Sequence, residues 1–223
     1  MAKGKRQSAG RAQERNREAT RQALIQAVGE LLADKGFTHL GVNALARRAG
    51  VDKVLIYRYF GGLPGLIKAF GQEGDFWPSI EELADGDIEY FKGLSLEQKL
   101  VSLGSNFLKG IRKRPLTQEI MIWEMAQHNE FTKELEAIRE KRMLQFAQMF
   151  IKAERAEETT VDLMAIMAII GAGLSYLVCR TRKGMHCYNS LQLDTDEGWQ
   201  RVEIAIRQIV KSVLGQYAGL QVK

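Results

Sequence analysis

The stretch GFTHLGVNALARRAGVDKVLIYRYF, residues 36–60, decides how the rest of this sequence is interpreted. Apolar residues recur in it every three or four positions, which predicts two short helices over 42–49 and 53–60. Gly50 can form a tight turn between them, and Asp52 can cap the second helix by accepting a hydrogen bond from a backbone N–H group. This layout is that of a helix-turn-helix, although an ordinary helical hairpin with a solvated basic face has the same spacing.

The sequence on both sides of this stretch predicts an all-α protein, because most windows repeat at three and four residues. We expect helices over 14–35, 42–49, 53–60, 62–72, 95–111, 116–127, 130–153, 161–182 and 195–217. Three domains follow from this pattern. They are a disordered basic arm over 1–13, a small three-helix domain over 14–62 and a larger helical domain over 63–223.

Charge is distributed unevenly along the 223 residues. Residues 1–60 hold 12 basic and 5 acidic side chains, whereas residues 61–223 hold 20 and 22. A basic segment joined to a nearly neutral remainder is typical of a polyanion-binding module attached to a second domain. The whole chain is 45% hydrophobic and 26% charged, which is the balance of a globular protein rather than a disordered one.

Three features predict a cytoplasmic protein. The two cysteines, Cys179 and Cys187, exclude a disulfide-rich secreted scaffold and suit a reducing compartment. The first residues are polar and contain no apolar signal segment. The run Leu163–Cys179 lacks charge over 17 residues, but Gly171 and Gly173 dilute its hydrophobicity, so we expect a buried helix rather than a membrane span.

Residues 36–60, with residues 21–32 before them, resemble the DNA-binding domain of the tetracycline repressor (TetR) family of bacterial transcriptional regulators. The resemblance runs without a gap over roughly residues 17–70. The matching positions are Leu24, Ala27, Leu31, Gly36, Phe37, Val42, Leu45, Ala46, Ala49, Gly50, Val51, Lys53, Ile56, Tyr57, Phe60 and Leu66. It implies a three-helix DNA-binding domain of the helix-turn-helix type and a larger C-terminal helical domain that binds a small-molecule ligand and forms a homodimer.

Carried onto this sequence, the resemblance implies a set of residues that contact DNA. They are Lys53, Val54, Tyr57, Arg58 and Tyr59 on the third helix. To the DNA-binding set we add Gly41, at the start of the second helix, and Arg17, a cation of the basic N-terminal segment. Lys53 and Val54 would lie nearest the bases, and Tyr57 and Tyr59 would reach the DNA backbone.

The sequence departs from the family pattern at three of its phosphate-contacting places. Gly41 stands where a hydroxyl residue is usual, Asp52 replaces a serine or threonine, and Leu63-Pro64 replaces a lysine and an acidic residue. Each change removes a phosphate contact or places a negative charge near one. The basic arm could compensate by lying along the DNA backbone or in the minor groove, or it could be a solvated tail.

Two stripes in the C-terminal half indicate self-association. Trp199, Val202, Ile206, Ile209 and Val213 are spaced 3-4-3-4, and Ala165, Ala168, Ala172, Ser175 and Cys179 form a ridge of small residues with the same spacing. Either stripe could be buried within one chain. Because the resemblance places the dimer interface on these last two helices, we expect it to contain Ala168, Ala172, Ser175, Trp199, Val202, Ile206, Ile209 and Val213.

Aromatic and methionine side chains are frequent on the middle helices. Such residues more often form ordinary core than the wall of a ligand pocket. As candidates for an effector pocket we select Phe107, Met121, Trp123, Met125, Phe146, Met167 and Tyr176. Since methionine-rich surfaces adapt to apolar ligands, a lipophilic small molecule is expected.

The function expected from these features is that of a transcriptional repressor. It would bind a palindromic operator in double-stranded DNA as a homodimer and leave it when the effector binds. The alternative is a helical dimeric ligand-binding protein that has lost sequence-specific DNA recognition. No nucleophile, glycine-rich phosphate loop or recognised zinc spacing occurs in the sequence, so no enzyme, metal or cofactor is expected.

Overall fold

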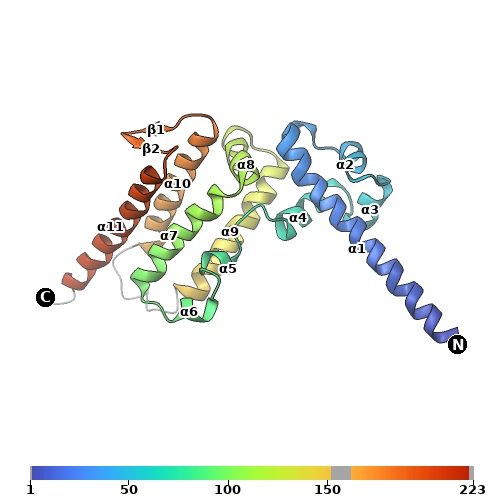
Figure 1. The fold of residues 1–223 in the computed structure, drawn as a ribbon, viewed down its shortest axis with the longest axis horizontal. Coiled ribbons are helices and arrows are strands. Elements are labelled where there is room, and N and C mark those ends of the chain that lie inside the picture. The colour runs from blue at the N-terminus through green and yellow to red at the C-terminus, as the bar shows by residue number, and fades with distance from the viewer. Residues whose placement is uncertain (1, 152–161, 221–223) are drawn as a thin grey trace. The chain divides into compact units, whose positions relative to one another are not determined.

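The computed structural model describes residues 2–151 and 162–220, and within these ranges the chain forms eleven α-helices, one short 3-10 helix and a two-stranded hairpin (Figure 1). The all-α prediction is confirmed. The chain divides into two compact units. The first contains Met1–Phe76 and Trp123–Ile138, and the second contains Trp77–Ile122 and Arg139–Lys223.

The first unit is built around the helix-turn-helix. It contains α1 (Ala2–Lys35), the 3-10 helix Phe37–His39, α2 (Val42–Ala49), α3 (Val54–Phe60) and α4 (Leu63–Glu73). Helix α1 packs against α2 and α4, and α3 packs against α4. The apolar side chains that fill the space between these helices are Leu24, Ala27, Val28, Leu31, Leu32, Leu45, Ala46, Ile56, Leu66, Ile67 and Phe70.

Gly50 makes the turn of this motif possible. Its φ is 67°, a left-handed conformation that glycine adopts without the steric penalty of a Cβ atom. The chain then closes the turn with a hydrogen bond of 3.0 Å from the Val51 N–H to the Ala46 carbonyl. The prediction of two short helices over 42–49 and 53–60 therefore agrees with the structure to within one residue.

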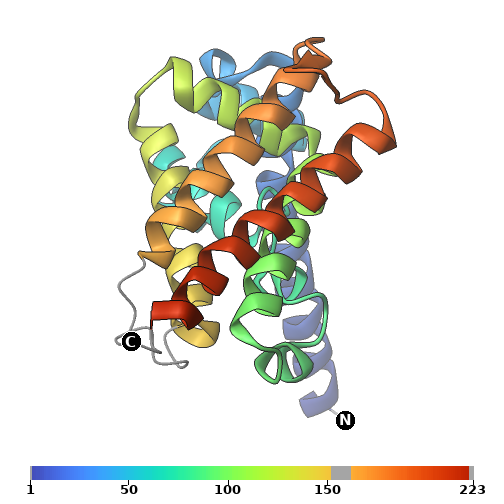
Figure 2. The ribbon, with the colours of Figure 1, turned by 90° about the vertical axis from the view of Figure 1, so that its left-hand side faces the viewer.

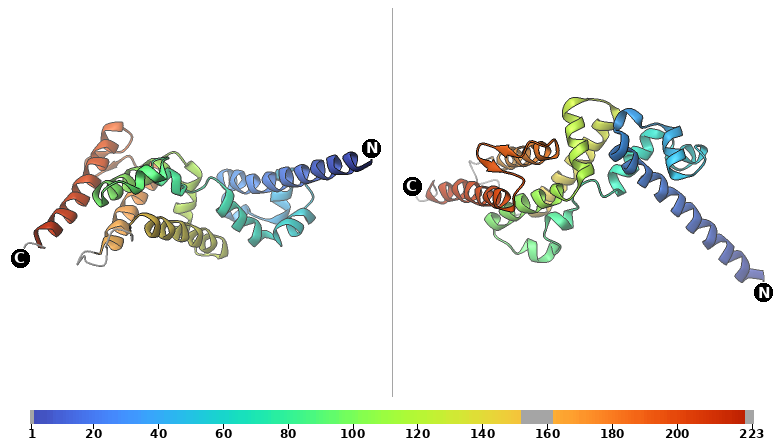
Figure 3. Two further views of the ribbon diagram at one scale, coloured as in Figure 1. Left: turned by 90° about the horizontal axis from the view of Figure 1, so that it is seen from below. Right: turned by 45° about the horizontal axis from the view of Figure 1, so that its top comes forward.

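Helix α1 is longer than the sequence pattern indicated. It begins at Ala2 rather than Glu14, so the segment expected to be a disordered arm is helical. Alanine, glutamine, arginine and lysine favour helix without any apolar partner, and proline is missing from this segment. The first turns of α1 extend past α2, α3 and α4 in the views of Figure 1 and Figure 3.

The end of α8 (Pro115–Ala126) and the start of α9 (Glu130–Phe150) belong to the first unit. The Trp123 ring stands edge-on to Phe37 with 4.9 Å between centroids. Gly71 lets α9 approach α4, because a Cβ at this position would lie 2.3 Å from Ile138 Cδ1. The boundary predicted after residue 62 therefore lies inside this unit, whose core continues through α4.

The second unit is a helical bundle with α7 at its centre. It contains α5 (Ile80–Leu83), α6 (Ile88–Lys92), α7 (Leu96–Arg112), α10 (Leu163–Arg182), α11 (Asp196–Leu220) and parts of α8 and α9. Helices α10 and α11 both pack on α7 and face the viewer in Figure 2. A cluster of three rings, Phe91, Phe146 and Phe150, joins α6 to α9 with centroids 4.7–5.6 Å apart.

Three short elements of this unit were not predicted. They are α5, α6 and the hairpin of β1 (Cys187–Tyr188) with β2 (Leu191–Gln192). Elements of two to five residues are too short to show a period, so their stability comes from turns and caps. A capping box at Ser79 and Glu82 starts α5, and it was present in the sequence as a recognisable S-x-x-E pattern.

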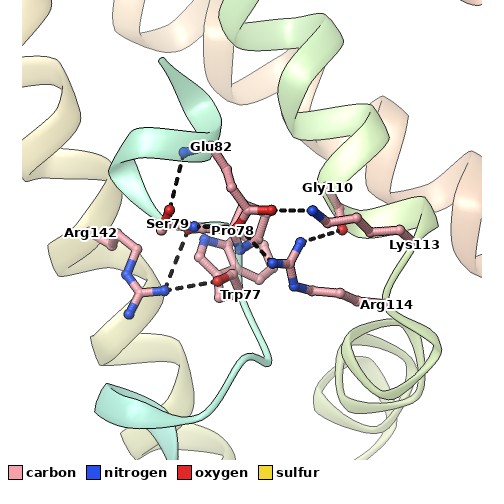
Figure 4. Close-up of polar contacts among 8 residues, drawn as sticks. All are labelled: Trp77, Pro78, Ser79, Glu82, Gly110, Lys113, Arg114 and Arg142. Carbon is pink, nitrogen blue, oxygen red and sulfur yellow. Dashed lines mark hydrogen bonds and ion pairs between the residues drawn. The ribbon is translucent and has the colours of Figure 1, made fainter. Parts of the chain in front are cut away.

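Glu82 also anchors α5 to α7 (Figure 4). Its carboxylate accepts hydrogen bonds from Lys113 and from the buried guanidinium of Arg114, the latter at 2.6 Å, and from the Ser79 backbone N–H at 3.0 Å. Burial alone would raise the pKa of this carboxyl. The hydrogen bonds from Lys113, Ser79 and Arg114 outweigh that effect and lower the pKa from 4.5 to about 2.

Glu82 should therefore make the protein sensitive to acid. Because its folded-state pKa is depressed, the ionised carboxylate stabilises the fold above pH 4.5, and this contribution is lost as the pH falls from 4.5 to about 2. Between pH 6 and pH 3, the wild type should lose on the order of 1–2 kcal/mol more unfolding free energy than Glu82→Gln. Urea unfolding at the two pH values measures this difference, and Glu89→Gln on α6, which is far more exposed, serves as the control. Equal losses in wild type and Glu82→Gln would contradict the assignment.

Candidate functional site

The outer face of α3 combines exposed cations with exposed apolar groups. Lys53 and Arg58 are exposed, and Val54 and Tyr57 are 60% and 58% exposed. Ile56 is fully buried, so the opposite face holds α3 to the unit. The Val54 N–H donates a hydrogen bond of 2.8 Å to Asp52 Oδ1, as the sequence predicted for a capping aspartate. The start of α3 is therefore fixed while its outer face is left open.

Two arginines of α1 lie against the end of α3. The Arg17 guanidinium sits 5.5 Å from the centroid of the Tyr59 ring, and Arg21 sits at the same distance from Phe60. Arg21 also forms a bidentate pair with Glu73 of α4, and this hydrogen-bonded partner lowers the pKa of the Glu73 carboxyl. The structure thus brings Arg17 beside the predicted DNA-contacting residues of α3. Tyr59 itself is half-buried beneath Arg17 rather than fully exposed.

Positions 41 and 63–64, where the sequence departs from the family pattern, lie at helix starts without a side-chain cap. Gly41 precedes α2 in an extended conformation, and no side chain there bonds the first N–H groups. Gly62 precedes α4 with a φ of 124°, and Pro64 follows in the first turn, where its missing N–H costs no helical hydrogen bond.

A serine at position 41 should restore the hydroxyl group that is usual at the start of the second helix. The backbone is extended and no atom lies within 4 Å of the place that a Cβ would occupy, so Gly41→Ser fits without strain. We expect a gain of a few tenths of a kcal/mol in stability from capping α2, about the difference between serine and glycine at this position. If the hydroxyl also reaches a phosphate, DNA affinity should rise about fivefold, as for one added hydrogen bond. Titration of a DNA duplex with Gly41→Ser and with Gly41→Ala separates the hydroxyl from the added methyl, and equal affinities would argue against a phosphate contact at this position.

The second unit contains an apolar cavity of about 240 Å³. It is bounded by side chains from α7, α9 and α10 together with Trp77. Its lining residues are Trp77, Leu103, Gly104, Phe107, Glu140, Met143, Leu144, Phe146, Ala147, Ile151, Met164, Met167, Ala168, Ile170, Gly171, Ala172 and Leu174. Among the described residues of this lining, Glu140 carries the one charge.

The structure brings together three of the seven predicted pocket residues. Phe107, Phe146 and Met167 line the cavity. The other four lie elsewhere: Met121 is buried in α8, Trp123 packs on Phe37, Met125 is 66% exposed, and Tyr176 stacks edge-on against Tyr188. Small lining residues such as Gly104 and Gly171 were missed because the selection used aromatic and methionine side chains alone.

Helix α10 is more exposed than predicted. By length and composition it is apolar enough to cross a membrane. Of its most apolar window of residues, 22% are buried within the chain, so most of this window is exposed. The expectation of a buried helix over Leu163–Cys179 is therefore wrong, because one side of it, which includes Leu174 and Val178, is covered and the rest is exposed. Its outer side presents Ile169, 73% exposed, with Ala165 and Tyr176 on the same face. On α11, Ile204 and Ile209 are 54% and 46% exposed.

The two predicted stripes are divided between the core and this surface. Trp199, Val202 and Ile206 are buried within the second unit, where Ile206 packs against Gly104 of α7. The Trp199 indole donates a 2.7 Å hydrogen bond to the Leu193 carbonyl. The remaining predicted interface residues keep some exposure: Ala168, Ala172 and Ile209 are exposed, and Ser175 and Val213 are half-buried. Ala168 and Ala172 also line the apolar cavity, so these two predicted interface residues lie at the cavity wall. Ile169 and Ile204 were missed because they lie outside both stripes.

Comparison with known proteins identifies the first unit. Residues 24–70 match the model of a family described as bacterial regulatory proteins, tetR family. No curated protein sequence matches the chain. This match contains α2, α3 and the buried face of α1 described above.

Solved structures of similar fold cover nearly the whole chain. A TetR family transcription regulator from Marinobacter aquaeolei VT8 is 20% identical, with a TM-score of 0.60 over 90% of this chain and 98% of that one. A TetR-like transcriptional regulator from Rhodococcus sp. RHA1 is 19% identical, with a TM-score of 0.55 over 92% and 97%. The fatty acid degradation regulator FadR from Bacillus halodurans is 16% identical, with a TM-score of 0.59 over 85% and 96%.

The predicted resemblance is thereby confirmed. The chain carries the N-terminal domain of the tetR family of bacterial regulatory proteins at residues 24–70 and has the fold of TetR-family transcription regulators.

Proposed function

We propose that this protein is a cytoplasmic, homodimeric transcriptional repressor that binds a palindromic operator and is released from it by a small lipophilic effector. The observation that carries the proposal is the exposed face of α3, within the domain that matches the tetR family. Lys53 and Arg58 supply charge for the phosphates or guanine edges, and the short helix can enter the major groove. Arg17, held beside Tyr59, adds a cation at the edge of this face.

The dimer would form through the outer faces of α10 and α11. Ile169, Ile204 and Ile209 are large apolar side chains left in contact with water in one chain. Exposed apolar patches on soluble domains mark interaction sites, and a two-fold interface would bury the same patch of both copies. A symmetric dimer would also present two α3 helices to two half-sites, about 34 Å apart along the duplex.

The effector would occupy the cavity of the second unit. Its volume of about 240 Å³ lies below the range usual for drug-sized ligands, and its walls are almost entirely apolar. These features support a compact lipophilic molecule. If effector and operator select different conformations, each must weaken the binding of the other by the same factor. Calorimetric titrations in both orders test this reciprocity, and independent binding would refute the coupling.

The proposal is tested by selecting genomic DNA fragments with the purified protein and then titrating salt on the best fragment. A single palindromic site, bound at least about a thousandfold more tightly than unrelated DNA, is the expected result. Salt-sensitive binding to all sequences alike would instead support a dimeric helical ligand-binding protein whose basic segment holds DNA without recognition. The exposed and unobstructed face of α3 argues for the repressor over this alternative.

A further inference from the structure

Val54 contributes little to the folded unit although it is the first residue of the helix α3. It remains 60% exposed, while Ile56, two residues on, is completely buried. The hydrogen bond from its N–H to Asp52 fixes the backbone at this point. The branched side chain is therefore held at the start of the helix and directed away from the core.

The neighbours of Val54 are not an ordinary apolar patch. Lys53 precedes it and Arg58 lies one turn on, both exposed. Tyr57, three residues on, is 58% exposed, so its ring lies on the same open face. An apolar side chain between two cations can bind a polyanion that also presents a methyl group. A hydrophobic protein surface would not match it, because binding there would bury the two charges without partners.

Double-stranded DNA has such a group. The edges of the base pairs in the major groove present hydrogen-bond donors and acceptors and a single apolar group, the 5-methyl group of thymine. Valine cannot read the donors or acceptors, but it can bury this methyl group. We propose that Val54 contacts the 5-methyl group of one thymine in each operator half-site and is a residue that determines sequence specificity. This proposal rests on the proposed function, since it requires α3 to enter the major groove.

The experiment replaces thymine by uracil, which removes the methyl group and leaves base pairing intact. The operator is first obtained by selection with the wild-type protein, and each thymine of both half-sites is then replaced in turn. Affinities are measured for wild type, for Val54→Ala, and for Met125→Ala as a control. Met125 is similarly exposed, at 66%, but lies on α8 outside the helix-turn-helix.

For wild type and Met125→Ala, one symmetry-related thymine position should stand out, with affinity falling about fourfold per half-site, as expected for one methyl group returned to water. In Val54→Ala the same replacement should change affinity less than about twofold, while affinity for the thymine operator falls. If no thymine is sensitive, or if Val54→Ala keeps the full sensitivity, the contact is refuted while operator binding stands. If the selection yields no specific site, the proposed function itself fails.

Discussion

Replacing Ile169 by glutamate should convert the proposed dimer into a folded monomer. Ile169 is 73% exposed near the middle of α10, so a charge there is hydrated in the single chain and costs little. In a two-fold interface the substitution would bury two like charges, and we expect the dissociation constant of the dimer to rise at least a hundredfold, about 3 kcal/mol. Sedimentation across a range of concentrations measures the change, and circular dichroism checks that the fold persists.

Tyr90→Glu is the matched control for this experiment. Tyr90 is 64% exposed in the same unit but lies on a different helix, α6. The Tyr90→Glu variant should sediment as the wild type does. Should Ile169→Glu also remain a dimer, the interface would have to lie on another surface.

Ile206 would be the wrong residue for this test, although it belongs to a stripe that the sequence pattern selected and Ile169 does not. Its side chain is 3% exposed and packs where Gly104 leaves room on α7. A glutamate there would bury a charge inside the unit, at a cost of about 4 kcal/mol or more. We therefore expect Ile206→Glu to unfold the second unit rather than simply separate two chains.

Lys53→Ala and Tyr57→Phe should each weaken operator binding by about 1–3 kcal/mol without changing stability. Lys53 is exposed, and the 58% exposure of Tyr57 leaves its hydroxyl open to a phosphate. Removal of the Lys53 ammonium should also reduce the slope of log affinity against log salt by about one, because one phosphate is no longer neutralised. Fluorescence anisotropy on the selected operator at several salt concentrations gives both quantities.

Lys68→Ala provides the control for charge alone. Lys68 lies on α4, is exposed, and faces Glu134 at 3.7 Å. Its removal should leave the operator affinity within about twofold, because surface pairs of this kind contribute little. Unchanged binding by both Lys53→Ala and Tyr57→Phe would show that another face of the first unit meets DNA.

The helix-turn-helix was predictable because its determinants are local. The three- and four-residue spacing selects the buried faces of α1, α2 and α3, Gly50 supplies a left-handed turn, and Asp52 caps α3. Each of these depends on residues within one or two turns of each other. The long helices of the second unit were found for the same reason, whereas α5, α6 and the hairpin are too short to have a period.

The sequence by itself therefore determined the long helices, apart from the first turns of α1, and which face of α3 remains outside. The tertiary structure decided which apolar stripe meets which partner. The spacing of apolar residues shows which of them share a face of a helix, but it does not show which other helix packs against that face. Ile206 and Ile209 are therefore equivalent in the sequence. Only the packing of α11 on Gly104 of α7 buries the first and exposes the second. The sequence likewise does not show which aromatic residues line the cavity. Trp77 at the cavity and Trp123 against Phe37 have the same side chain and differ only in their neighbours.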